Sequence, residues 1–363
     1  MSVSKIKVNE YNGAPVLEAY RIPAAVDLFC GRGARSVPQL TMEAFEGGWG
    51  TLALAPEGDV CADGRSLKAE RLLCEEVPGA EALPLPSALR ADGGMADIGL
   101  MSAGGERLFC LPDGFMDLKR LRALFCYASA FPVRIAFRPC LKELCEGGQM
   151  NEGAVADRLG MKGLPAVAES LAAEMVLTLA AEYGVAVHVR TVSCAATLAA
   201  VERALANGLD VTCDAAIANL LFTDEEVRVD ALDGAYKVFP PLRSPDERAA
   251  LWQALDEGRI DAVVSNCRAR SADDLALPFE QVPFGGERLG TALADLLNGW
   301  EAQGRPCAID RLLEALSAGP RRILGGKECR AADLLDDVGA TYALRTQDGW
   351  SVEYDVPEEE EGE

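Results

Sequence analysis

Consecutive strand–helix units in the middle of the chain constrain its fold most strongly. A first helix is predicted from apolar residues at three- and four-residue spacing, namely Leu164, Val167, Leu171, Met175 and Leu179. Gly184 ends this helix, and residues 185–189 follow as a short apolar strand. The same order repeats with a helix from about 195 to 208 and a strand over 209–213.

A third unit begins at a helix-capping signal. Ser244 and Glu247 have the spacing of a capping box, and Pro245 occupies the first helical position. Residues 260–265 then form a continuous apolar strand. Successive units of this kind predict a parallel sheet covered by helices. An eight-fold barrel and an open doubly wound sheet both fit this pattern.

The two ends of the chain differ from the middle. Residues 5–11 alternate polar and apolar side chains, and residues 341–356 form two β-rich runs around Asp348-Gly349, which is a hairpin signal. We therefore expect both ends to pair into one small β-domain. The run of acids at 358–361 predicts a disordered, solvated tail.

Composition narrows the class of function. The net charge of −22 argues against nucleic-acid binding and against docking on anionic membranes. No apolar run reaches the roughly 18 residues that span a bilayer, and residues 1–10 lack a signal-peptide core, so we expect a cytoplasmic protein. The twelve cysteines contain no C-x-x-C pair, which favours small buried side chains over a zinc ribbon.

His188 is the only histidine of the chain. Histidine is the commonest metal ligand and the commonest general base near neutral pH. In strand geometry His188 lies opposite to Thr191, so we expect its side chain to point toward the helical layer. A chain with a single histidine cannot form a metal site that needs several histidines.

Several ordered strings closely resemble the dihydroorotase family, most clearly between residues 148 and 300. They include residues 150–153 (Met-Asn-Glu-Gly), 187–193 (Val-His-Val-Arg-Thr-Val-Ser), 211–214 (Val-Thr-Cys-Asp) and 237–244 (Lys-Val-Phe-Pro-Pro-Leu-Arg-Ser). The resemblance implies a (β/α)8 TIM-like barrel of the metal-dependent amidohydrolase type, with a small β-appendage formed by both termini. The domain boundaries that follow are residues 1–25 and 326–356 for the small β-domain, 26–325 for the barrel and 357–363 for the tail.

The resemblance also implies zinc held by a His-x-His, a bridging carboxylate, two further histidines and a final aspartate. Here the positions that match the family's site residues have other side chains, at Phe29, Gly31, Gly33, Pro112, Thr191, Ala218 and Asn266. Zinc needs several nitrogen or oxygen ligands at about 2.0–2.2 Å. We therefore expect no metal and no cofactor, and a chain that is not an enzyme.

The resulting interpretation is a catalytically inactive dihydroorotase-like chain. Some bacterial chains of this kind accompany aspartate carbamoyltransferase in pyrimidine biosynthesis, and the resemblance implies the same partner here. A homo-oligomer of this chain is also possible. One alternative is an anion-binding protein that uses arginines near the former site, namely Arg32, Arg138, Arg268 and Arg270. Another is a hydrolase of cyclic amides with non-standard residues.

Overall fold

Eight parallel strands close into a barrel in the computed structural model, which describes residues 3–57, 61–114, 116–228, 232–286, 288–325 and 339–355. The strands are β5 (Ala25–Cys30), β6 (Trp49–Leu54), β7 (Glu81–Pro84), β8 (Leu108–Cys110), β9 (Arg134–Phe137), β12 (Ala186–Val189), β13 (Val211–Ala216) and β14 (Ala262–Val264). They pair in this order within two sheets, and parallel bridges at Ser87–Cys110 and Gly31–Arg268 join the sheets into a ring. The predicted TIM-like barrel is confirmed.

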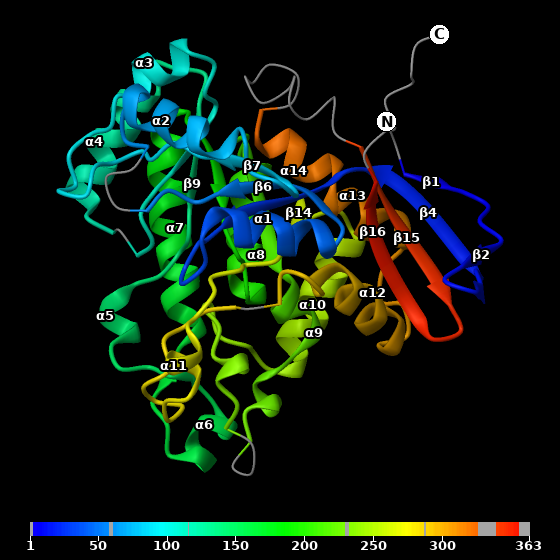
Figure 1. Cartoon of the computed structure of the whole chain (residues 1–363). Helices are drawn as coiled ribbons and strands as arrows, with labels where there is room; N and C mark the ends of the chain where they lie inside the picture. The colour runs from blue at the N-terminus through cyan, green and yellow to red at the C-terminus, as the bar shows by residue number, and fades with distance from the viewer. Residues whose placement is uncertain are drawn as a thin grey trace, which may run out of the picture.

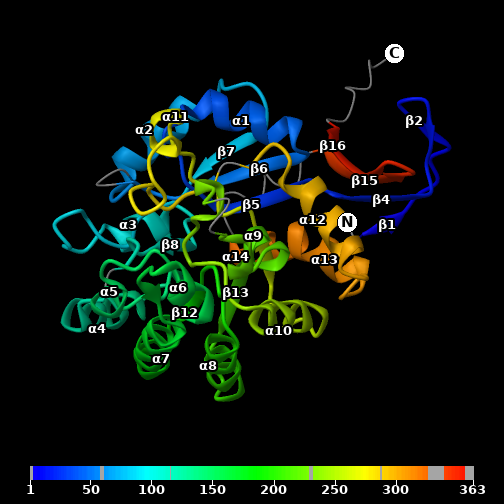
Figure 2. The same ribbon diagram turned by 90° about the horizontal axis from the view of Figure 1, so that it is seen from below.

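Helices surround this ring of strands (Figure 2). The longer ones are α1 (Val37–Glu46), α2 (Gly64–Cys74), α4 (Leu118–Ala128), α7 (Ala166–Tyr183), α8 (Ala195–Ala206), α10 (Pro245–Asp256), α12 (Ala292–Ala302) and α13 (Ile309–Leu316). Shorter helices lie in the connections and are α3 (Ile98–Ala103), α5 (Lys142–Cys145), α6 (Ala154–Leu159), α9 (Ile217–Leu221), α11 (Ala272–Leu275) and α14 (Ala318–Ile323). In the described ranges, no helix combines the length and apolar character needed to cross a lipid bilayer.

The helix α7 exists as predicted, but its buried face is not the predicted one. Val167 and Leu171 are exposed, whereas small residues of the neighbouring face, such as Ala168, Ala172 and Ala173, are fully buried. Four alanines, together with Val176 and Leu177, form most of the buried face, because small side chains allow a helix to pack closely.

The start of α10 shows half of the predicted capping box. The hydroxyl of Ser244 accepts a hydrogen bond from the Glu247 backbone N–H at 3.4 Å. The Glu247 carboxylate does not return to Ser244; it accepts from the Ala195 backbone N–H at 2.6 Å. Glu247 therefore ties α10 to the start of α8, where a negative charge is favourable beside the exposed N–H groups.

Strands from both ends of the chain form one antiparallel sheet beside the barrel (Figure 1). Its order is β1 (Ser4–Lys5), β4 (Glu18–Pro23), β15 (Ala340–Thr346) and β16 (Gly349–Asp355). The appendage and its hairpin are confirmed. The expected single strand over 5–11 is wrong, because β1 ends at Lys5 and residues 10–11 form β2 with β3 (Ala14–Pro15). The domain boundary at 326 and the tail at 357–363 lie outside the described residues.

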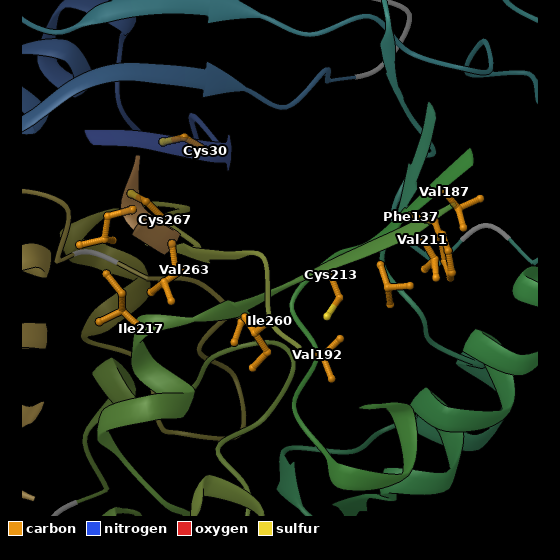
Figure 3. Packing of buried hydrophobic residues seen from close by; sticks show 14 of the residues in the cluster. Cys30, Phe137, Val187, Val192, Val211, Cys213, Ile217, Ile260, Val263 and Cys267 are labelled. Carbon is orange, nitrogen blue, oxygen red and sulfur yellow. The ribbon is translucent and has the colours of Figure 1, made fainter. Parts of the chain in front are cut away.

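Apolar side chains fill both sides of the barrel wall. The inward-facing cluster includes Val26, Leu28, Phe29, Ala136 and Val264. The alternate residues of the strands face the helices, and Figure 3 shows Phe137, Val187, Val211 and Cys213 among them. Because the wall of the barrel is apolar on both sides, polar side chains that could bind a ligand are expected at the carboxyl ends of the strands, where TIM barrels place their sites.

Candidate ligand site at the barrel mouth

Side chains that follow four different barrel strands meet at the mouth. Asp113, after β8, accepts from Arg138 at 3.2 Å and from Arg190 at 3.0 Å, using one carboxylate oxygen for each. Arg138, after β9, also donates to Asn266 Oδ1 at 2.9 Å. Asn266 lies after β14 and donates to the Phe239 carbonyl at 3.0 Å. One acid therefore holds two guanidinium groups, and the three residues follow the neighbouring strands β8, β9 and β12.

A cavity of about 210 Å³ opens beside this network. Its polar lining comes from Asp113, Arg138, Asn266 and Arg268, and its apolar lining comes from Phe239 and Phe284. The two phenyl rings pack edge to face with centroids 5.7 Å apart. A second cavity of about 550 Å³ shares Asp113, Phe239 and Phe284 and continues toward α5. The mouth thus offers a cationic side, an acid and an aromatic wall.

The charges at the mouth are held out of water to different degrees. Burial lowers the pKa of Arg138, and its side chain is 13% exposed. Burial would raise the pKa of Asp113, but Arg138 and Arg190 beside it outweigh burial and lower the pKa below its usual value. Asp113 is therefore an anion at neutral pH, and the network keeps a net positive charge.

Unpaired polar atoms surround the same place. Within the described residues, Arg138 Nε, Arg190 Nε and Thr191 Oγ1 are buried without a hydrogen-bond partner. Buried polar groups are satisfied in most folded proteins, so a cluster of unsatisfied ones indicates a place for water or ligand. Arg268 is exposed, and no hydrogen bond or ion pair of its guanidinium is found among the described residues.

An aromatic ring stands where the resemblance implies the first zinc ligand. The Phe29 ring stacks on the His188 ring, with ring centroids 5.3 Å apart. The guanidinium group of Arg190 also lies over the Phe29 ring, with Cζ 4.4 Å from the ring centroid. Phe29, Thr191 and Asn266 all have positive φ, at 60°, 49° and 53°. Such backbone conformations cost free energy and are typical of functional sites. The strand ends keep a strained geometry around a space that Phe29 partly fills.

His188 points into the barrel, and the prediction that it faces the helical layer is wrong. It pairs in register with Ala136, which faces inward, and its Nε2 lies 2.7 Å from Asp214 Oδ2. Nδ1 lies 2.8 Å from Thr212 Oγ1. Alternation from 188 to 191 fails because β12 ends at Val189 and Thr191 adopts a left-handed conformation. His188 is fully buried with both nitrogens occupied, which is a structural role.

The remaining predicted positions divide between closure of the barrel and the surface. Gly31 donates its N–H to the Cys267 carbonyl at 2.8 Å, and Gly33 approaches Ala269 so closely that a Cβ would meet its carbonyl at 2.1 Å. Pro112 is exposed just before Asp113. Ala218 lines a neighbouring, mainly apolar cavity of about 230 Å³, which shares Asn266 with the mouth cavity.

Two of the four arginines predicted to bind anions line the mouth cavity, namely Arg138 and Arg268. Arg32 forms an ion pair with Glu70 instead. Arg270 is buried and donates to the backbone carbonyls of Gly234 and Pro283 at 2.7 and 3.1 Å, so it holds loops.

Sequence reasoning missed Asp113, Arg190 and Asp214 as central groups. A weak signal existed for each, since Asp113-Gly114 follows an apolar strand and Asp214 lies within one.

The residues at the mouth do not fit a zinc ion. Phe29, Gly31 and Ala218 offer no side-chain donor, and the cation Arg190 lies over the Phe29 ring. In the part of the chain that the structure describes, no group of three or more His, Cys, Asp or Glu side chains could hold a metal. Arginine stays protonated and donates only, so it repels a divalent cation.

The barrel and its appendage give the chain a TIM-like fold of the amidohydrolase type. Solved structures with this fold include D-hydantoinase from Bacillus sp. AR9, with a TM-score of 0.72, 16% identity and coverage of 90% of this chain and 76% of that chain. L-hydantoinase from Arthrobacter aurescens gives a TM-score of 0.68 with 19% identity, covering 84% and 71%. No sequence-family model matches the chain.

Sequence relatives narrow the class further. A dihydroorotase of Desulfotalea psychrophila is 31% identical over 293 residues, which is 78% of this chain and 67% of the relative. A "Dihydroorotase-like protein" of Pseudomonas aeruginosa is 34% identical over 239 residues, covering 63% and 55%. The chain belongs to the dihydroorotase family.

These comparisons overturn one expectation. The prediction that the chain is not an enzyme is wrong, because the sequence relatives are named as dihydroorotases and the structural neighbours as hydantoinases, which are hydrolases.

Proposed function

We propose that this member of the dihydroorotase family binds a carboxylate-bearing cyclic amide, or its ring-opened ureido acid, at the barrel mouth without a resident metal. The observation that carries the proposal is the cavity lined by Arg138 and Arg268 beside Asp113. The planar guanidinium group matches a carboxylate with two parallel hydrogen bonds. Dihydroorotate and carbamoyl aspartate are ligands of this chemistry.

The lining supports each part of such a ligand. The exposed Arg268 would bind the carboxylate, and the carboxylate of Asp113 would accept an N–H of the ring or of the ureido group. Phe239 and Phe284 offer an apolar wall against which a small ring can pack. A neutral cyclic amide would lose the contact with arginine, so the charged ligand should bind more tightly.

Calorimetry tests this proposal with dihydroorotate and carbamoyl aspartate as ligands and hydantoin as a neutral ring. We expect heat with at least one acid and weaker binding of hydantoin. Arg268→Ala should weaken acid binding at least tenfold, because a hydrogen bond to a charged group contributes about 1.5–3 kcal/mol. Arg288→Ala is the matched control, since Arg288 is an exposed arginine that lines the neighbouring apolar cavity and not the mouth cavity. Absence of heat with both acids would overturn the proposal.

Ring opening and ring closure should be followed on the same samples, because the relatives are named as hydrolases. Each reaction is measured with chelator and with added zinc. A reaction that depends on stoichiometric zinc would contradict the metal-free part of the proposal, and it would do so whether or not the acids bind.

A second candidate function is association with aspartate carbamoyltransferase in the cytoplasm. The observation that favours a protein partner is a leucine patch formed by Leu72, Leu73 and Leu100, whose side chains are 55%, 70% and 76% exposed. Leu72 and Leu73 lie on α2 and Leu100 lies on α3, and both helices are at the same end of the molecule in Figure 1. The ion pair of Arg71 with Glu106 joins α2 to the segment that follows α3. Grouped apolar side chains on a surface are typical of interfaces.

Light scattering of the chain mixed with the transcarbamoylase tests this association. We expect a complex heavier than either component, and its loss in the double variant Leu73→Glu with Leu100→Glu. Leu205→Glu is the control, because Leu205 is 58% exposed on α8, outside the leucine patch. Unchanged masses on mixing would refute the partnership, and the mass of the chain alone reports whether it forms a homo-oligomer.

A further inference from the structure

Two thiols face each other in the segment that follows β9. Cys140 is 5% exposed, and Cys145 is the last residue of α5. Their Sγ atoms lie 3.5 Å apart. A disulfide has a sulfur–sulfur bond of about 2.05 Å, so an approach of roughly 1.5 Å would allow the bond to form. We propose that Cys140 and Cys145 form a reversible disulfide, a redox modification site on the rim of the barrel mouth.

The position of α5 makes this pair accessible. Lys142, Glu143 and Leu144 are exposed, and Cys145 is half-buried on the side that faces Cys140. Gly147 follows with φ of +71°, so the backbone beyond the turn already uses a conformation that glycine adopts freely. β9 ends at Phe137, so the turn that carries the two thiols lies outside the barrel strands.

Cys30 and Cys267 make a useful comparison. These thiols also interact, but they are 0% and 3% exposed at the closure of the barrel. A reagent in solution cannot reach them in the folded protein. Access to solvent, and not proximity of the thiols, thus distinguishes the Cys140–Cys145 pair.

A small disulfide such as oxidised glutathione can supply the oxidant that formation of the Cys140–Cys145 bond requires. The Cys145 thiolate attacks one sulfur of the reagent, which forms a mixed disulfide and releases one glutathione thiolate. Cys140 then attacks Cys145 Sγ and releases the second glutathione. Two electrons pass from the protein to the reagent, and the two thiol protons end on the two glutathione molecules. Burial raises the pKa of Cys140 to about 12, so the more exposed Cys145 reacts first.

The bond would fix a segment that borders the candidate ligand site. The larger mouth cavity is lined by Asp113, Lys142 and Cys145 together. The Lys142 side chain lies against Gly114, where an added Cβ would meet its Cε at 2.2 Å. A disulfide would therefore hold the turn that carries Lys142 next to Asp113. Formation of the bond does not require the proposed ligand.

Peptide mapping tests the disulfide directly. The folded chain is incubated with oxidised glutathione, free thiols are alkylated, and the protein is digested with trypsin. Cleavage after Lys142 separates the two cysteines into residues 135–142 and 143–158, so a disulfide links these two peptides. We expect the linked pair in the wild type, and its loss on reduction.

Two variants separate this outcome from general thiol oxidation. In Cys140→Ser no second thiol can complete the exchange, so Cys145 should keep a stable glutathione adduct. Cys126→Ser is the matched control, because Cys126 is an exposed cysteine on α4, and the linked pair should persist in it. A wild-type protein that carries glutathione on Cys145 beside a free Cys140, or that leaves both thiols free, would overturn the proposal.

Native digestion then tests the effect on α5. Trypsin should cut the folded, oxidised chain after Lys142 at least threefold more slowly than the reduced chain, since the bond restrains local opening. Equal rates would overturn the restraint of α5.

Discussion

Two glutamates of the same helix should differ sharply in what they contribute to stability. Glu169, in the first turn of α7, is 4% exposed and pairs with Arg243 at 3.4 Å, whose side chain is equally buried. It also accepts the Ser193 backbone N–H at 2.9 Å. Glu174, one turn further, pairs with Arg203, and both side chains are 43–60% exposed. Comparing the variants Glu169→Gln and Glu174→Gln therefore measures how burial changes the contribution of an ion pair to stability.

The expected magnitude follows from the partners that remain. Breaking a buried ion pair costs about 3–5 kcal/mol. We expect about 3 kcal/mol for Glu169→Gln, because Arg243 keeps the Asn151 side chain, the Leu164 carbonyl and the Ser193 hydroxyl as acceptors. Exposed pairs contribute about 0.2–1 kcal/mol, so Glu174→Gln should cost at most that.

These free energies translate into melting temperatures. An unfolding entropy of about 2.1 cal/mol/K per residue gives roughly 0.76 kcal/mol/K for a chain of 363 residues. Glu169→Gln should therefore lower the melting temperature by about 4 °C, and Glu174→Gln by about 1 °C or less. Scanning calorimetry of both variants at pH 7 measures the difference. Equal shifts would refute the argument that burial of the ion pair sets its contribution.

Three further predictions concern single groups. Burial raises the pKa of Asp27 to about 7, so the folded chain binds this proton more tightly than the unfolded chain, and stability falls as pH rises from about 4 to 7. Asp27→Asn should remove that loss of stability. A difference in melting temperature between variant and wild type that stays constant with pH would contradict this prediction. Lys237→Met should lower the melting temperature by about 3 °C, because it leaves the buried Phe279 carbonyl and the Gln149 side chain without their hydrogen-bond donor. A shift under 1 °C would be inconsistent with a stabilising role of these hydrogen bonds. Chelator should leave the melting temperature unchanged within 1 °C, whereas stabilisation by several degrees on adding zinc would reveal a metal site.

The strand–helix alternation predicted a parallel sheet covered by helices, and the family resemblance selected the barrel among the folds that fit this pattern. Two details failed for geometric reasons. Large side chains at three- and four-residue spacing predicted the core face of α7, yet Val167 and Leu171 are exposed while Ala172 and Ala173 are buried. The orientation of His188 was assigned from strand alternation, which stops when the backbone leaves the extended conformation before Thr191.

The mouth network could not be predicted from the sequence. Asp113, Arg138, Arg190 and Asn266 are separated by many residues, and each is an ordinary polar residue after an apolar strand. Their contacts depend on the closure of the barrel, which brings the ends of non-adjacent strands within hydrogen-bond distance. Sequence could name the strand ends, but the pairing of one acid with two arginines required the fold.

The family resemblance and the chemistry of the mouth rest on different residues. Asn151, Ser193 and Arg243 belong to strings that carry the resemblance, and the structure shows them in one buried network with Glu169. This network joins the segment after β9, the start of α7 and the turn before α10, so it holds the loops above the barrel. A chain can keep such a framework while the few side chains at the strand ends change. Family membership therefore follows from the framework, whereas ligand chemistry must be argued from the arginines and the acid that now occupy the mouth.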